Sequence, residues 1–225
     1  MTSGYVNSGP ISNTEILKIG NNAEPPQYPD HPRRIFGATG GFLNNDFLTC
    51  GGMDSVAEIT DKCYMLGSEG PFATMRTKRW MAASIVLEDE KLWILGGISS
   101  SNSRLSSTEY IFSDGRNEEG PPMPITLESH AMVKINETTS FLVSGGNNDS
   151  WTYSKRTWFY NGKWIDGPDL EKGSRGLSLG IIRDSVTLHE YVVAAGGYDG
   201  FILNNAVEIM DVQENKWEPG NPLLL

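Results

Sequence analysis

Runs of bulky apolar residues alternate along this chain with polar and glycine-rich segments. Four of the runs end in a pair of glycines, and they are FLTCGG (47–52), LWILGG (92–97), FLVSGG (141–146) and VVAAGG (192–197). The pairs follow one another at steps of 45, 49 and 51 residues. About ten residues after each pair comes a second short apolar segment, and the centres of these segments are Tyr64, Tyr110, Phe159 and Ile209. This regular spacing predicts an internal repeat.

Each repeat has room for four short strands. A Gly/Pro-rich stretch follows each apolar centre, then a strand of small residues opens with Arg or His and turns tightly into the next apolar run. Helix is nearly absent, because no segment keeps a 3.6-residue apolar period beyond two turns. Four antiparallel strands at this period predict the blade of a β-propeller. The apolar run is then the buried second strand, and its glycines allow a sharp turn at its end.

The repeats divide the chain into four full units and part of another. The full units are 31–76, 77–124, 125–170 and 171–222, and residues 1–30 supply a partial blade around NTEILKI (13–19), centred on Leu17. We therefore interpret 1–225 as a single propeller domain or a fragment of one. The alternative is a loose five-blade assembly, which would leave a bare strand edge in water.

The period and the glycine pair resemble kelch repeats. Two stretches carry the likeness, STEYIF…EEGPPMP…HAMVKINETTSFLVSGG and GGYDGFILNNAVEIMDVQENKW. The last strand of the second unit lacks Trp, and the Arg-x-x-His start of the first strand never occurs complete. The resemblance implies an all-β, kelch-type β-propeller, incomplete, with four full blades and part of a fifth. A generic β-sandwich is the alternative. The propeller family with Gly-His and Trp-Asp signatures is disfavoured, because neither dipeptide occurs.

Charge and cysteine content narrow the partners and the compartment. The net charge of −10 argues against nucleic acid and against an anionic membrane surface as partner. No apolar stretch approaches the ~18 residues of a spanning helix. The N-terminal residues show no basic or apolar region of a secretory signal, so we expect a cytoplasmic protein. Cys50 and Cys63 are then expected as reduced, mostly buried thiols.

The sequence predicts no catalytic centre. Gly176–Gly180 matches the G-x-S-x-G pattern, but it lies inside a predicted strand and not in the required strand–turn–helix context. His31, His130 and His189 have no metal-ligand spacing, and no phosphate or dinucleotide fingerprint occurs. We therefore expect no enzyme activity, no metal and no cofactor.

The resemblance implies that a protein or peptide partner binds on the loop face beyond the glycine pairs. The implied residues follow each pair or open the next small-residue strand, and they are Met53, Asp54, Ile98, Ser99, Asn147, Asn148, Tyr198 and Asp199, with the openers Arg34, Arg79, His130 and Arg175. Asn, Tyr and Arg suit peptide binding, since each offers several hydrogen bonds. The alternative is structural, with the arginines tying neighbouring blades together and the asparagines forming turns.

The resemblance further implies a role in substrate recognition, as in cullin-based ubiquitin ligase adaptors, or in actin-associated scaffolding. The alternative is a small-molecule enzyme on the same fold, of the sialic acid epimerase or lyase type. A cluster of two or three acids or histidines would favour the enzyme, whereas a rim of Arg, Asn and Tyr would favour the binding module. Burial of the second strand predicts a core that contains Trp93, Leu95, Leu142, Val192 and Val193.

Overall fold

The structure is a computed structural model that describes residues 4–6, 9–12, 29–43, 45–88, 90–135, 140–148, 153–187 and 189–224. For residues 4–6, 11 and 140–144 it describes the backbone alone. Its regular elements are all β-strands, and no helix occurs within these ranges. The chain forms two compact units. Unit 1 is Met1–Ser103 with Ser107–Pro122, and unit 2 is Arg104–Ser106 with Met123–Leu225.

Unit 1 contains two four-stranded antiparallel sheets and a hairpin. The hairpin pairs β1 (Gly4–Val6) with β2 (Gly9–Ile11). The first sheet consists of β3 (Thr39–Leu43), β4 (Asp46–Cys50), β5 (Lys62–Met65) and β6 (Ala73–Thr74). The second sheet consists of β7 (Ala83–Leu87), β8 (Lys91–Leu95), β9 (Thr108–Phe112) and β10 (Asn117–Gly120). In both sheets, spatial neighbours are also neighbours in the chain.

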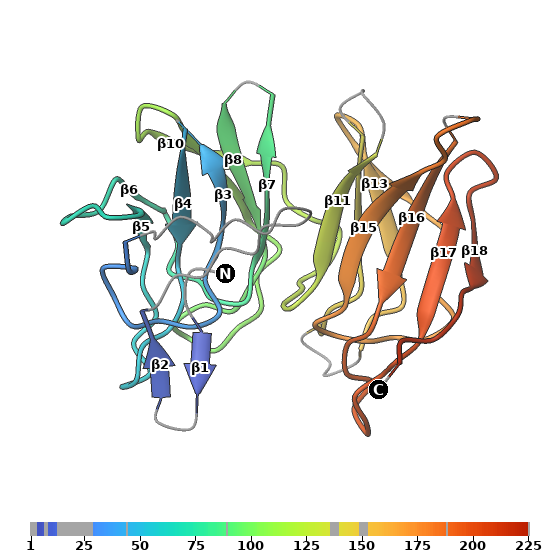
Figure 1. Cartoon of the computed structure of the whole chain (residues 1–225). Helices are drawn as coiled ribbons and strands as arrows, with labels where there is room; N and C mark the ends of the chain where they lie inside the picture. The colour runs from blue at the N-terminus through green and yellow to red at the C-terminus, as the bar shows by residue number, and fades with distance from the viewer. Residues whose placement is uncertain are drawn as a thin grey trace, which may run out of the picture. The chain divides into compact units, whose positions relative to one another are not determined.

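Unit 2 repeats this arrangement twice. The third sheet consists of β11 (Ala131–Ile135), β12 (Ser140–Ser144), β13 (Thr157–Tyr160) and β14 (Trp164–Asp166). The fourth sheet consists of β15 (Ser178–Arg183), β16 (Glu190–Ala195), β17 (Val207–Asp211) and β18 (Lys216–Pro219). Figure 1 shows the strands of the fourth sheet side by side in chain order. The prediction of four-stranded antiparallel sheets is therefore confirmed.

Apolar residues of neighbouring sheets pack together inside each unit. In unit 1, Leu48 of the first sheet shares a core with Leu92 and Ile94 of the second. In unit 2, Ile135 of the third sheet shares a core with Val192 of the fourth. The first strands of adjacent sheets also contact each other, β3 with β7 and β11 with β15. A sheet with one apolar face needs such a neighbour to keep that face from water.

Strand β8 shows why the second strand of a repeat is apolar throughout. Trp93 and Leu95 are fully buried, as is Val192 of β16, so these predictions are confirmed. Val193 is only half-buried, because successive side chains of a strand face opposite sides and it lies opposite the core that takes Val192. The side chain of Leu142 lies outside the described part of the structure.

The glycine pairs adopt backbone conformations that other residues avoid. Gly96 has φ = 60° and Gly97 has φ = 94°, and both glycines of the other three pairs also have positive φ. A Cβ added at Gly97 would lie 2.6 Å from the carbonyl oxygen of Trp80. The turn after the buried strand therefore needs glycine for its backbone angles and for close packing, as predicted.

The two cysteines form a disulfide, so the prediction of reduced thiols is wrong. Cys50 of β4 and Cys63 of β5 are directly opposed, with Cα atoms 4.0 Å apart. This close approach brings the two sulfur atoms within bonding distance. The expectation of free thiols rested on the usual distance between directly opposed Cβ atoms, about 4.5–5.5 Å, which is slightly too long for a disulfide. Both residues are buried in the core of unit 1. The expectation of a cytoplasmic protein loses the support that reduced thiols would have given.

Part of the predicted N-terminal blade lies outside the described residues. The segment 13–19, with its centre at Leu17, belongs to that part. No helix of the described chain is long and apolar enough to cross a membrane.

Candidate functional site

Backbone bridges show which loop residues are structurally equivalent. The residue that follows each glycine pair bridges to one residue before the first strand of the same sheet. The four bridges are Phe36–Met53, Trp80–Ile98, Glu128–Asn147 and Arg175–Tyr198. The predicted strand openers Arg34, Arg79 and His130 are therefore not equivalent to Arg175. Residue type suggested a common position, but strand pairing sets the register.

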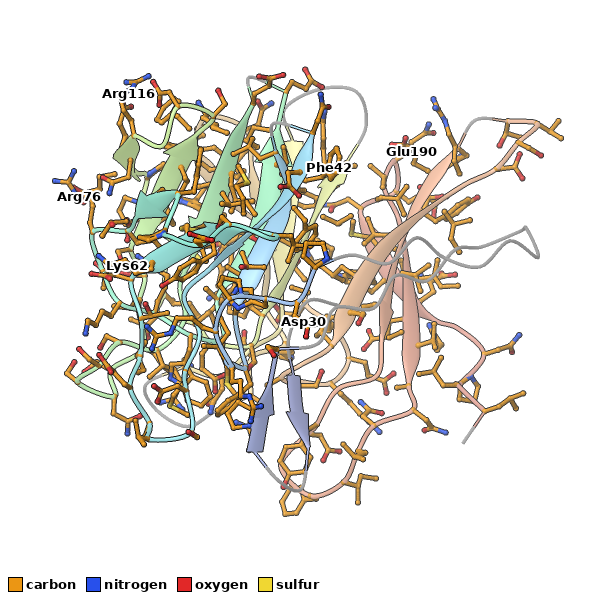
Figure 2. All side chains as sticks on the ribbon, turned by 60° about the vertical axis from the view of Figure 1, so that its left-hand side comes forward. Asp30, Phe42, Lys62, Arg76, Arg116 and Glu190 are labelled. Atoms are coloured by element: carbon orange, nitrogen blue, oxygen red, sulfur yellow. A yellow bond between two sulfur atoms is a disulfide. The ribbon has the colours of Figure 1, made fainter. Side chains whose placement is uncertain are left out.

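Arg79 is a structural residue, which corrects its assignment to a partner-binding rim. Its guanidinium is fully buried, and Nη1 donates to the carbonyl oxygens of Gly96 (2.7 Å) and Ser107 (3.0 Å). Nη2 lies 2.6 Å from Oε1 of Glu109. Desolvation by burial lowers the pKa of Arg79, while the charge of Glu109 opposes that shift. Arg76 and Arg116, by contrast, project outward from unit 1 (Figure 2).

The other predicted positions of unit 1 differ in burial and in contacts. Asp54 accepts hydrogen bonds from the backbone N–H groups of Val56 and Glu58, at 3.0 and 2.9 Å. Ile98 and Ser99 are buried, and Met53 is half-buried. Arg34 is exposed. Within unit 1, these positions do not form one accessible polar cluster.

Unit 2 contains a polar cluster centred on Glu128, which the sequence analysis did not select. Glu128 is 1% exposed, and neither carboxylate oxygen has a hydrogen-bond partner within the described part of the chain. Its Oε1 lies 3.7 Å from Nη2 of Arg104 and 3.6 Å from Nη1 of Arg175. Arg104 is nearly buried, whereas the side chain of Arg175 is 39% exposed. Two guanidinium groups therefore approach one buried carboxylate.

Two predicted residues, His130 and Asn147, are buried in unit 2. Both ring nitrogens of His130 and Oδ1 of Asn147 have no hydrogen-bond partner among the residues with described side chains. Burial lowers the pKa of His130 to about 4, so the imidazole is neutral at pH 7. Asn148 is half-buried and already engaged with other residues. Unsatisfied buried polar groups are rare in native proteins, so their presence marks this region for attention.

The loop after the fourth glycine pair carries three consecutive exposed apolar side chains. Phe201, Ile202 and Leu203 are 90%, 65% and 77% exposed. Asp199 holds the turn by accepting hydrogen bonds from the N–H groups of Phe201 (2.9 Å) and Ile202 (3.0 Å), which lowers the pKa of its carboxyl. Tyr198 bridges to Leu203 as well as to Arg175.

Arg175 and the apolar loop are therefore neighbours on one surface. The guanidinium carbon of Arg175 lies 5.6 Å from the centre of the Tyr198 ring, and Tyr198 meets Tyr153 edge-on at 5.9 Å. The structure thus brings together Arg175, Tyr198 and Asp199 of the predicted set. Glu128 and Arg104 were missed. No sequence motif marks Glu128, because its place beside Arg175 is set by strand pairing.

Among the described residues, neither a metal-binding group nor a nucleophile elbow offers an alternative to the Glu128 cluster as the candidate site. They contain no group of three or more His, Cys, Asp or Glu residues that could hold a metal ion. Ser178 of the G-x-S-x-G pattern lies at the start of β15, a strand. A serine on an extended strand does not have the sharp turn of a strand–turn–helix elbow, which presents the nucleophile in that motif.

Comparison with known proteins supports the fold alone. No protein-family model matches the chain, and no curated protein matches it. A solved structure titled "Structure of YjhT" is similar, with a TM-score of 0.63 and 15% sequence identity over 83% of this chain. The match spans 65% of the YjhT chain, which is less than two thirds of its length. With the four antiparallel sheets, this likeness shows a kelch-type β-propeller fold.

The fold does not by itself select a function. In all, 170 chains of solved structures match this one, and a common fold can host many unrelated activities. The function must therefore be argued from the residues of unit 2.

Proposed function

We propose that this chain is a protein-binding module and that the loops of unit 2 bind an acidic peptide segment that also carries apolar residues. The observation that carries the proposal is the surface formed by Arg175, Tyr198 and the loop 199–203. We call it the Arg175 surface. It combines an accessible cation with three exposed apolar side chains, Phe201, Ile202 and Leu203.

The accessible charge of Arg175 supports an acidic ligand. Its side chain is 39% exposed, and Nη1 lies 3.6 Å from Oε1 of the buried Glu128 carboxylate. Arg175 is the accessible member, and its guanidinium can pair with a carboxylate in a fixed fork geometry. Glu128 also keeps the guanidinium near one position, which reduces the ordering cost of binding.

The apolar loop supports a protein or peptide in place of a small ion. Side chains as large as Phe201 and Ile202 are usually buried, and contiguous exposed apolar groups mark interaction surfaces. The residue that anchors their turn, Asp199, uses its carboxylate on the backbone of the loop itself. The loop therefore presents its apolar side chains from a defined turn.

This module would serve in substrate recognition, as in cullin-based ligase adaptors, or in scaffolding. The proposal includes a cytoplasmic location and no catalytic activity. The Cys50–Cys63 disulfide argues against the location, because disulfides persist mainly in oxidising compartments.

The test uses purified chain and an array of acetylated peptide amides in which acidic, basic and apolar residues are permuted. We expect peptides with both acidic and apolar residues to bind best. Arg175→Gln and Phe201→Ser should each weaken that binding at least about tenfold, a loss of ~1.4 kcal/mol. The matched controls are Arg183→Gln and Val186→Ser, which change exposed residues at the end of β15 and in the following turn. Equal effects of control and site variants would contradict the proposal.

Melting temperature must be measured on the same variants. If Arg175 acts only as a counter-ion of Glu128, Arg175→Gln lowers the melting temperature and affinity follows through unfolding. An unchanged melting temperature with weaker binding supports the proposed role.

A second candidate is a small-molecule enzyme on the same fold, of the epimerase or lyase type. Buried Glu128, with neither oxygen hydrogen-bonded by a described residue, lies beside two guanidinium groups and two residues from buried His130. Such grouped ionisable residues occur at catalytic sites. Saturable binding of a small sugar acid that is lost in Glu128→Gln, without peptide binding, would favour this candidate.

A further inference from the structure

Structurally equivalent positions in the second and fourth sheets hold different residues. In the second sheet, Arg79 precedes the first strand. Its guanidinium donates hydrogen bonds to the carbonyl oxygens of Gly96 and Ser107 and to the carboxylate of Glu109. Glu109 also accepts hydrogen bonds from the N–H groups of Arg76 (2.5 Å) and Thr77 (3.1 Å). Every part of this cationic site is supplied by unit 1.

Strand register identifies the matching position in the fourth sheet. The first pair of β7 with β8 is Ala83–Leu95, and the first pair of β15 with β16 is Ser178–Ala195. Arg79 stands four residues before Ala83, and Ser174 stands four residues before Ser178. Ser174 therefore occupies the position of Arg79.

The groups that accept hydrogen bonds from Arg79 also have counterparts in the fourth sheet. The N–H of Gly96 donates to the carbonyl of Ser107 (3.1 Å), and the N–H of Gly196 donates to the carbonyl of Ala206 (3.0 Å). Glu208 corresponds to Glu109, and its Oε2 accepts from a backbone N–H in the same way, at 2.8 Å. The fourth sheet thus keeps both carbonyls and the carboxylate but has a serine where the arginine stands in the second sheet.

A cavity lies at that place in unit 2. Its lining is formed by the connection before β15 and by the fourth sheet, and includes Lys172, Ser174, Gly196, Ala206 and Glu208. The cavity is small and open to solvent. All four counterparts of the arginine site are in the lining. Within the described chain, no residue donates a hydrogen bond to Oε1 of Glu208, the oxygen whose counterpart in Glu109 takes Arg79.

From this correspondence we propose that the cavity at Ser174 binds a guanidinium group supplied by a ligand. The carboxylate of Glu208 would pair with the cation, and the carbonyls of Gly196 and Ala206 would accept its N–H groups, as their counterparts do for Arg79. Planar guanidinium matches this set because its donors are fixed in a fork. Lys172 also lines the cavity, but it is exposed. This site goes beyond the proposed function, because it selects a cation, whereas the Arg175 surface selects an anion.

The test titrates the purified chain with methylguanidinium, with methylammonium and with neutral methylurea, and follows backbone amide NMR shifts. We expect saturable binding of methylguanidinium in the millimolar range, with shifts centred on Ser174, Gly196 and Ala206. Methylurea should not bind. Absence of saturable methylguanidinium binding, or equal binding of methylurea, overturns the proposal.

Two variants locate the ligand. Glu208→Gln should weaken methylguanidinium binding at least about tenfold, because the carboxylate is lost. Ser174→Arg should abolish binding and raise the melting temperature, because it supplies the guanidinium within the chain. The controls are Glu214→Gln and Ser185→Arg, which make the same changes at exposed turn positions. Unaltered binding in both Glu208→Gln and Ser174→Arg overturns the assignment to this cavity.

The source of the guanidinium is distinguished by a third probe, acetyl-arginine methylamide. Tighter binding of this probe than of methylguanidinium indicates the arginine side chain of a protein partner. Equal or weaker binding indicates a free guanidinium compound. Because these cationic probes differ from the acidic peptides, failure of this site leaves the test of the Arg175 surface unaffected.

Discussion

Arg79 and Glu109 form a fully buried ion pair in unit 1, with Nη2 of Arg79 2.6 Å from Oε1 of Glu109. Their side chains are 0% and 2% exposed. The pair joins the connection before β7 to β9 of the same sheet. The terminal nitrogens of the guanidinium also donate to the carbonyl oxygens of Gly96 and Ser107 and to the hydroxyl of Ser107. The position that the sequence suggested for partner binding therefore holds the fold together.

Removal of one partner of this pair should destabilise the protein strongly. Arg79→Met leaves the Glu109 carboxylate buried without its counter-ion, so the free energy of unfolding should fall by about 3–5 kcal/mol. Urea denaturation measures the change. In a double-mutant cycle with Glu109→Gln, the double variant should lose less than the sum of the two single variants. Arg116→Met, at an exposed ion pair with Asp114, is the control and should have no measurable effect.

Leu95 tests the buried second strand of the repeat. The side chain is 0% exposed, so Leu95→Ala removes apolar contacts and leaves a cavity. The free energy of unfolding should fall by about 2–5 kcal/mol. Val186→Ala, at an 88% exposed position, should change it little. A loss below ~1 kcal/mol for Leu95→Ala would contradict the placement of β8 between two covered faces.

The stability of the protein should fall as the pH drops from 6.5 to 4. Burial lowers the pKa of His130 from 6.5 to about 4, so in this window the unfolded chain binds a proton that the folded protein excludes. The contribution is fully present above pH 6.5 and is lost as the pH falls toward 4, with an upper bound of about 3 kcal/mol. Burial also lowers the pKa of His31, which adds to the same trend.

His130→Phe isolates this contribution, because phenylalanine does not titrate. Thermal melts at several pH values should show a smaller loss of stability between pH 6.5 and 4 in this variant than in the wild-type protein. The lowered carboxyl pKa of residues such as Asp184 and Asp199 has its effect below pH 4, and so it does not confuse the measurement. Equal slopes in the two proteins would show that His130 is accessible to protons in the folded state.

The disulfide should make the stability of unit 1 sensitive to reductant. Cys50 and Cys63 are 13 residues apart, and closing a loop of about this length restricts the unfolded chain by ~3 kcal/mol. Dithiothreitol should therefore lower the denaturation midpoint of the wild-type protein. The double variant Cys50→Ala/Cys63→Ala should have a low midpoint that dithiothreitol does not change. Two free thiols in the folded, non-reduced protein would contradict the disulfide.

The repeat and the strand class could be predicted because they depend on local patterns. Apolar runs that end in Gly96–Gly97 and its equivalents report a buried strand and a turn with positive φ, and both are properties of a few consecutive residues. The same is true of the absence of a helical period. Burial of Trp93 and Leu95 followed from their place in such a run.

The candidate site could be predicted only in part. Tyr198 and Asp199 were found because they directly follow a glycine pair. Glu128 was missed because it carries no local motif and becomes notable only when Arg104 and Arg175 approach it. Arg104 itself lies 24 residues before Glu128 in the chain, so their proximity depends on how the strands of unit 2 are arranged.

The sequence by itself determined the four repeats, the all-β class, the glycine turns and most of the buried second strand, since each of these is encoded in the order and type of neighbouring residues. Tertiary structure decided the roles of the polar residues. Arginines that look alike in sequence became a buried structural cation at Arg79 and an accessible one at Arg175, because strand pairing shifts their register relative to the glycine pairs. The same pairing set Ser174 in the position of an arginine and joined Cys50 to Cys63. Charge and reactivity depend on distance and burial, and both arise only when separate strands come together.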